Sequence, residues 1–81
     1  MSELNELAQQ LQEIIEEKCG ITIDNYDSNY FDAGLDSYSF MELVAELEQK
    51  YNIEFSNDDF ANEDFFSING LAAIIEEKRN V

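Results

Sequence analysis

"FDAGLDSYSFMELVAEL", from Phe31 to Leu47, contains a serine at the point where a loop turns into an amphipathic helix. Asp36 or Ser37 is well placed to cap a helix, because short polar side chains accept hydrogen bonds from the first N–H groups of a helix. Apolar residues then recur at helical spacing and continue past the quoted stretch: Phe40, Leu43, Val44, Leu47 and Tyr51. The spacing predicts an amphipathic helix with Ser37 in its first turn.

Two further helices are predicted, one on each side of this stretch. In the first, from Glu3 to Lys18, polar residues fill the positions between the apolar ones, which are Leu4, Leu7, Ala8, Leu11, Ile14 and Ile15. Cys19 and Gly20 end it, because glycine readily adopts the left-handed conformation after a helix. The apolar residues of the last helix are Ile68, Leu71, Ala72, Ile74 and Ile75. We expect a cap near Ser67 and a modest cost from Gly70 inside the helix.

The segments between these helices have weaker patterns. Residues 20–35 lack a sustained period, so we expect a long loop pinned to the core by its large apolar side chains: Ile21, Ile23, Tyr26, Tyr30, Phe31 and Leu35. Such a long loop is uncommon without a functional reason. Ser56 can cap a brief helical turn that runs to Ala61. The predicted fold is therefore all-α, a small antiparallel bundle of three main helices plus one short helix, in a single domain over residues 1–81.

The charge of the chain restricts its partners. Nineteen acidic residues against four basic ones give a net charge of −15, which repels nucleic acid and anionic membranes, so basic protein partners are favoured. We expect no nucleic-acid binding and no membrane insertion, since no apolar run is long enough to span a bilayer. The one cysteine, Cys19, has no internal disulfide partner. We therefore expect a cytoplasmic protein.

Most catalytic chemistry is excluded by what the chain lacks. It has no histidine, and "GLDS" does not match the G-x-S-x-G turn of serine hydrolases, so we assign no catalytic residue. The Asp- and Asn-rich loop gives no register of the EF-hand pattern. Cys19 has no second thiol or imidazole with which to bind zinc. We predict no metal site and no enzymatic activity.

Ser37 has two possible roles on these grounds. It could simply cap the helix, which is the more common use of a serine at this position. It could also accept a phosphate-containing group from another enzyme, because the free N–H groups and the positive dipole end of a helix favour a phosphate.

The run from Phe31 to Phe55, "FDAGLDSYSFMELVAELEQKYNIEF", resembles the centre of an acyl carrier protein. The signature of that family is G-x-D-S-L in acidic surroundings, at the start of a helix that carries a Glu-Leu pair. The residues that match it in place are Gly34, Leu35, Asp36, Ser37, Glu42 and Leu43. The similarity extends more loosely over nearly the whole chain, including the order of its helices.

This resemblance implies a carrier rather than a catalyst. Ser37, with Asp36 beside it, would receive 4′-phosphopantetheine from a phosphopantetheinyl transferase, and acyl groups would be carried as thioesters on the terminal thiol. The residues implied in partner contact are Tyr38, Met41, Glu42, Ala45 and Glu46. The implied partners are the transferase and the acyl- or aminoacyl-loading ligases and synthases, with basic surfaces. We expect a free-standing, monomeric protein, with a domain excised from a larger synthase as the alternative.

Two departures from the family pattern leave the cargo open. Tyr38 replaces the usual Leu, and Ser39 stands where many fatty-acid carriers have an acid. Fatty acyl, polyketide, aminoacyl and D-alanyl cargo are all compatible with the motif, whereas the G-G-x-S of peptidyl carriers is not matched. The alternative function is an unmodified acidic helical adaptor that binds a basic protein partner, with Ser37 as a cap only.

Overall fold

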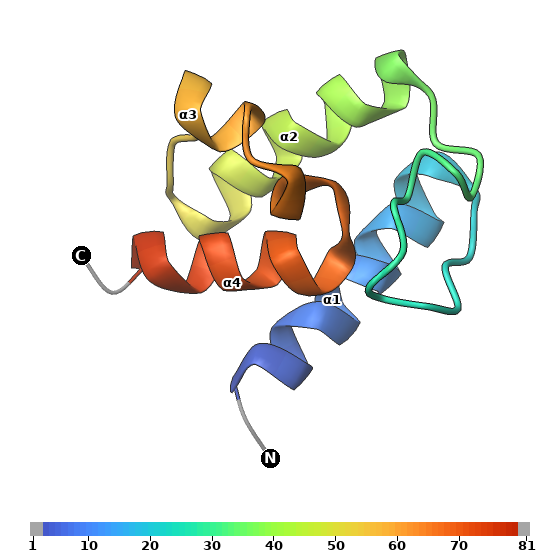
Figure 1. Cartoon of the computed structure of the whole chain (residues 1–81), viewed down its shortest axis with the longest axis horizontal. Coiled ribbons are helices and arrows are strands. Elements are labelled where there is room, and N and C mark those ends of the chain that lie inside the picture. The colour runs from blue at the N-terminus through green and yellow to red at the C-terminus, as the bar shows by residue number, and fades with distance from the viewer. Residues whose placement is uncertain (1–2, 80–81) are drawn as a thin grey trace.

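The computed structural model describes residues 3–79, with side chains from residue 6 onward. The elements are α1 (Glu3–Cys19), α2 (Ser37–Tyr51), α3 (Asn57–Phe60), the 3₁₀ turn η1 (Glu63–Phe66) and α4 (Ile68–Arg79). In Figure 1, α1 runs towards the loop that connects it to α2, and both α2 and α4 run back away from that loop. The predicted all-α bundle of three main helices and one short helix is confirmed.

The predicted apolar stripes of the three main helices meet in one core. The fully or nearly fully buried residues are Leu7, Ala8, Leu11 and Ile15 of α1; Phe40, Leu43, Val44 and Leu47 of α2; and Ile68, Leu71, Ala72 and Ile75 of α4. Ile14, Tyr51 and Ile74 are partly buried against them. The side chain of Leu4, predicted to belong to the stripe of α1, lies outside the described residues. Burial of these stripes is the main stabilising contribution in so small a domain.

The loop over residues 20–36 is pinned to the core as the sequence predicts. Gly20 has a φ of +73° and ends α1, while Ile23, Tyr30 and Leu35 are buried. The Tyr30 hydroxyl donates a hydrogen bond to the Phe65 carbonyl oxygen, and the Tyr30 N–H donates to the carbonyl of Phe66. These bonds fix the middle of the loop on η1.

One polar residue of α1 is buried against the loop over residues 20–36. Gln12 is 9% exposed rather than solvated, and its Oε1 accepts a hydrogen bond from the Ile23 N–H at 3.2 Å. A buried backbone N–H needs such a partner, because leaving it unpaired costs free energy. Gln12 therefore connects α1 to the loop.

The short elements before α4 confirm one prediction and add a turn that the sequence pattern did not predict. Ser56 caps α3 in a capping box with Asp59, as expected of a serine at this position. The turn η1 was not predicted, although its Phe65 is fully buried. The ring of Phe65 lies 5.0 Å from those of Phe55 and Phe60 and 5.8 Å from that of Phe40, measured between ring centroids.

Gly70 has a different role from the one expected. A Cβ atom at this position would overlap the backbone of Asp64, its carbonyl oxygen above all. Glycine is therefore what allows α4 to approach η1 this closely, and the expected propensity cost is secondary.

Candidate functional site

Two adjacent residues at the start of α2, Asp36 and Ser37, have different roles. Asp36 is the N-cap: its backbone is extended, its Oδ1 accepts a hydrogen bond from the Ser39 N–H at 2.7 Å, and its carbonyl accepts from Phe40 at 2.9 Å. Ser37 is the first residue of the helix and is exposed. Its hydroxyl forms no hydrogen bond with any residue that the structure describes. Because Asp36 does the capping, the hydroxyl of Ser37 remains available to solvent.

The end of the loop sets this geometry. Gly34 has a φ of +114°, a conformation that side-chain-bearing residues rarely adopt, and the turn before it is closed by hydrogen bonds to the carbonyls of Tyr30 and Phe31. Leu35, at 4% exposed, then anchors the chain in the core. The next two residues, Asp36 and Ser37, emerge at the surface.

The local electrostatics suit a phosphate ester on Ser37. The N–H groups of Ser37 and Tyr38 have no hydrogen-bond partner among residues 3–79, so the positive end of the α2 dipole is left partly unsatisfied. The hydrogen bond from the Ser39 backbone lowers the pKa of Asp36, with a further contribution from the Ser39 side chain. An exposed hydroxyl beside free N–H groups therefore fits a phosphodiester-linked group.

The same surroundings give Ser37 no means of activating itself. Asp36, its neighbour, already accepts the Ser39 N–H, and the chain contains no histidine. The Cys19 thiol lies 4.0 Å from the Ser39 carbonyl oxygen, and burial is the largest of the effects that raise its pKa. A thiol that ionises less readily is rarely present as the thiolate that could accept a proton. Among residues 3–79, no side chain is therefore positioned to take the proton of the Ser37 hydroxyl.

The predicted contact residues gather on the outer side of α2. Tyr38 and Met41 are 74% and 59% exposed, and Glu42 and Ala45 are exposed too. Glu46 is only partly exposed, and its Oε1 lies 3.7 Å from Lys18 Nζ at the end of α1. No pattern in the sequence indicates that Lys18 reaches this face, because the contact depends on how α1 packs beside α2.

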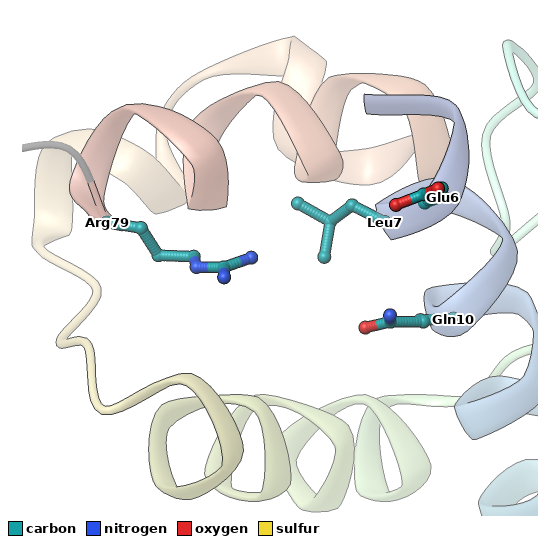
Figure 2. A pocket seen from close by; sticks show the side chains of 4 residues that line it. All are labelled: Glu6, Leu7, Gln10 and Arg79. Atoms are coloured by element: carbon teal, nitrogen blue, oxygen red, sulfur yellow. The ribbon is translucent and has the colours of Figure 1, made fainter. Parts of the chain in front are cut away.

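One hollow of the surface lies far from Ser37. The hollow in Figure 2 is lined by Glu6, Leu7, Gln10 and Arg79, between the first half of α1 and the end of α4. Gln10 accepts a hydrogen bond from the hydroxyl of Tyr51, which lies about 21 Å along α2 from Ser37 at 1.5 Å per residue. This hollow is thus remote from the serine.

The described residues contain neither a cluster of metal-binding side chains nor a membrane-spanning helix. No three His, Cys, Asp or Glu side chains within residues 3–79 come together in a way that could hold a metal ion. None of the described helices is both long and apolar enough to cross a membrane.

Comparison with known proteins shows the family of this chain. A family model described as "Phosphopantetheine attachment site" matches residues 9–76. The D-alanyl carrier protein of Bacillus cereus strain B4264 is 32% identical over 77 residues, which cover 91% of this chain and 98% of that protein. The D-alanyl carrier protein of Bacillus anthracis strain CDC 684 has the same identity and coverage.

Proposed function

Since the chain belongs to the family of phosphopantetheine-dependent carrier proteins, with a covalently attached 4′-phosphopantetheine, we propose that this group is attached to Ser37. The observation that carries the proposal is the exposed hydroxyl of Ser37 on the first turn of α2, left free because Asp36 caps the helix. The group supplies a terminal thiol that holds cargo as a thioester. Within this proposal residues 1–81 form one carrier domain that catalyses no reaction itself.

The proposed attachment step is a transfer of phosphopantetheine from coenzyme A to Ser37. The Ser37 Oγ bonds to the phosphorus of coenzyme A that bears the pantetheine, the pyrophosphate bond breaks, and the adenosine bisphosphate half leaves. The hydroxyl proton passes to a base of the transferase, because none is positioned beside Ser37. The N–H groups of Ser37 and Tyr38 then face a phosphodiester, whose negative charge the helix end favours.

The test is the intact mass after incubation with coenzyme A and a broad-specificity phosphopantetheinyl transferase. Wild type and Ser39→Ala should gain the mass of phosphopantetheine, and Ser37→Ala should not. Ser39 is the matched control because it lies two residues further along the same turn. Circular dichroism checks that Ser37→Ala is folded, as expected while Asp36 remains the cap. Modification of Ser37→Ala would refute the assignment.

For the cargo, we propose an aminoacyl group, with D-alanyl as the first candidate. The support is the D-alanyl carrier proteins among the relatives, together with Tyr38 and Ser39 in place of the residues usual in fatty-acid carriers. Fatty acyl or polyketide cargo is the alternative. The phosphopantetheine-bearing protein should gain a D-alanyl mass from a D-alanine-activating ligase and ATP, and lose it with hydroxylamine. Loading by fatty acyl ligases alone would contradict this choice.

The proposed partners are the transferase and a loading ligase with basic surfaces that meet the outer side of α2. Asp36 and Glu42 are proposed to steer the encounter, while Tyr38, Met41 and Ala45 supply apolar contact and Glu46 adds charge. Nucleic-acid binding is not expected, and the monomeric state and cytoplasmic location remain predictions. An unmodified adaptor is no longer favoured, since it leaves the match to an attachment-site family unexplained.

A further inference from the structure

All six phenylalanines of the chain lie in one cluster with Tyr30. Neighbouring ring centroids in it are 5.0 to 6.4 Å apart, which is a distance of direct contact between aromatic rings. The members of this aromatic cluster are Tyr30, Phe31, Phe40, Phe55, Phe60, Phe65 and Phe66. They come from the loop before α2, from α2, from the segment that follows it, and from α3 and η1. The aromatic cluster thus fills the space where these segments meet.

Phe40 connects the aromatic cluster to the start of α2. It follows Ser37 by three residues, so the two side chains are neighbours on the helix, about 4.5 Å apart along its axis at 1.5 Å per residue. The Phe40 ring is 8% exposed and contacts five other rings, at centroid distances of 5.3 to 6.4 Å. A group carried by Ser37 that turned into the core beside Phe40 would therefore have to displace these rings.

The centre of the aromatic cluster is held in place by contacts outside it. Tyr30 and Phe65 are 0% exposed, and the hydroxyl of Tyr30 donates a hydrogen bond to the carbonyl of Phe65. The turn η1 itself lies so close to α4 that a Cβ atom at Gly70 would overlap the backbone of Asp64. Protein interiors are densely packed, and added methylene groups force side chains out of their preferred conformations. A long alkyl chain can therefore enter between these rings only by unpacking them.

The chemistry of the cargo decides whether burial is favourable. A long acyl chain presents many methylene groups, and their transfer from water into an apolar core is favourable. A small aminoacyl group has little apolar surface, and burial of its charged ammonium group is unfavourable. A carrier whose core is filled by aromatic rings therefore suits the small polar cargo, which is best left in solvent.

We propose that the aromatic cluster closes the core to long acyl chains, so that this carrier takes small polar acyl groups and leaves them in solvent. Phe40 is the residue that sets this specificity, because it belongs to the helix that begins at Ser37 and its ring contacts five others. The proposal rests on the carrier function proposed above and supplies a physical reason for its class of cargo.

The first experiment compares two cargoes on the wild-type protein. A broad-specificity phosphopantetheinyl transferase with acetyl- or octanoyl-coenzyme A attaches the acylated group directly, and intact mass verifies each product. The two forms should melt at the same temperature. Hydroxylamine should cleave each thioester as fast as it cleaves the same acyl-coenzyme A in solution, because the protein covers neither. An octanoyl form that melts higher than the acetyl form, or is cleaved several-fold more slowly than octanoyl-coenzyme A, would overturn the proposal.

The second experiment opens the aromatic cluster. Phe40→Ala removes the ring next to Ser37 and leaves an apolar cavity, which an octanoyl chain can fill. In this variant the octanoyl form should melt above the acetyl form, and hydroxylamine should cleave it several-fold more slowly than octanoyl-coenzyme A. Leu7→Ala is the matched control, since it opens the core in the first half of α1, and its two forms should behave alike.

Acetyl and octanoyl forms of Phe40→Ala that behave alike would overturn the role of Phe40. The comparison on the wild-type protein does not depend on whether either variant folds.

Failure of this proposal is distinguishable from failure of the proposed function. If the carrier function is wrong, the wild-type protein gains no acylated mass with either coenzyme A ester. If only the closed core is wrong, both masses appear and the octanoyl form alone is protected from hydroxylamine.

Discussion

At the scale of single residues, the site depends on which of two adjacent side chains caps α2. Both Asp36 and Ser37 were acceptable caps in the sequence, because both have a short polar side chain. The backbone decides between them: Asp36 is extended, with φ −99° and ψ 170°, whereas Ser37 is already helical. The sequence therefore predicted that one of these two residues caps the helix. Which of them does so depends on the main-chain geometry that Gly34 and Leu35 impose.

The capping role of Asp36 predicts a dependence of stability on pH. The hydrogen bond from Ser39 lowers the pKa of Asp36 from its ordinary value of 3.8. The stabilisation is therefore fully present above that value and is lost as the pH falls through the lowered pKa. At pH 7, Asp36→Ala should melt below wild type, and the difference should narrow under acid conditions.

The control is Asp32→Ala, which removes the same charge from an exposed loop position and should not lower the melting temperature. Melting followed by circular dichroism over a series of pH values measures both variants. A difference between Asp36→Ala and wild type that stays constant throughout the acid range would contradict the assigned cap.

At the scale of elements, the predictable parts were those with a long apolar period. The spacing predicted α1, α2 and α4, and the cap at Ser56 predicted α3. The turn η1 was not predicted, because four residues are too few to show a period. In addition, Phe65 is buried by aromatic rings that are distant in sequence, such as that of Phe40. The role of Gly70 was mistaken for the same reason: its constraint is the backbone of Asp64, which no helical pattern reveals.

The variant Gly70→Ala distinguishes the effect of helix propensity in α4 from the effect of packing between α4 and η1. Propensity alone predicts that alanine stabilises α4 by up to about 1 kcal/mol. The overlap of a Cβ atom with Asp64 predicts the opposite, a loss of about 1 to 3 kcal/mol typical of overpacking. Urea unfolding measures the sign. Ala73→Gly, on the exposed side of the same helix, is the control and should cost about 1 kcal/mol. A more stable Gly70→Ala would show that α4 does not approach η1 closely.

At the scale of the whole molecule, carboxylates far outnumber the cations that could balance them. Of the four basic residues, Lys18 contacts Glu46, Lys78 Nζ lies 2.7 Å from Asp59 Oδ2, and the Arg79 guanidinium lies 5.4 Å from the centre of the Tyr51 ring. Burial on its own would raise the pKa of Asp59, but the hydrogen bonds from Lys78 and Ser56 outweigh it and lower that pKa. Composition predicted the excess charge, but these contacts depend on helix placement.

The excess charge predicts that salt stabilises the fold. Raising the ionic strength from about 0.01 M to about 0.1 M shortens the Debye length from about 30 Å to about 10 Å, which weakens repulsion between distant carboxylates. The melting temperature should therefore rise with NaCl, and millimolar Mg²⁺ should raise it at lower ionic strength. A melting temperature that changes with neither NaCl nor Mg²⁺ would contradict the prediction that repulsion between carboxylates destabilises the fold.

Fragment mass spectrometry of the modified wild-type protein tests whether phosphopantetheine is attached to the hydroxyl of Ser37. The chain offers six serines: Ser2, Ser28, Ser37, Ser39, Ser56 and Ser67. Fragments that end between Ser37 and Ser39 distinguish the two serines nearest the start of α2. We predict that N-terminal fragments carry the added mass as soon as they include Ser37, and not before. An added mass that first appears at Ser39, or at any other hydroxyl, would contradict attachment at Ser37.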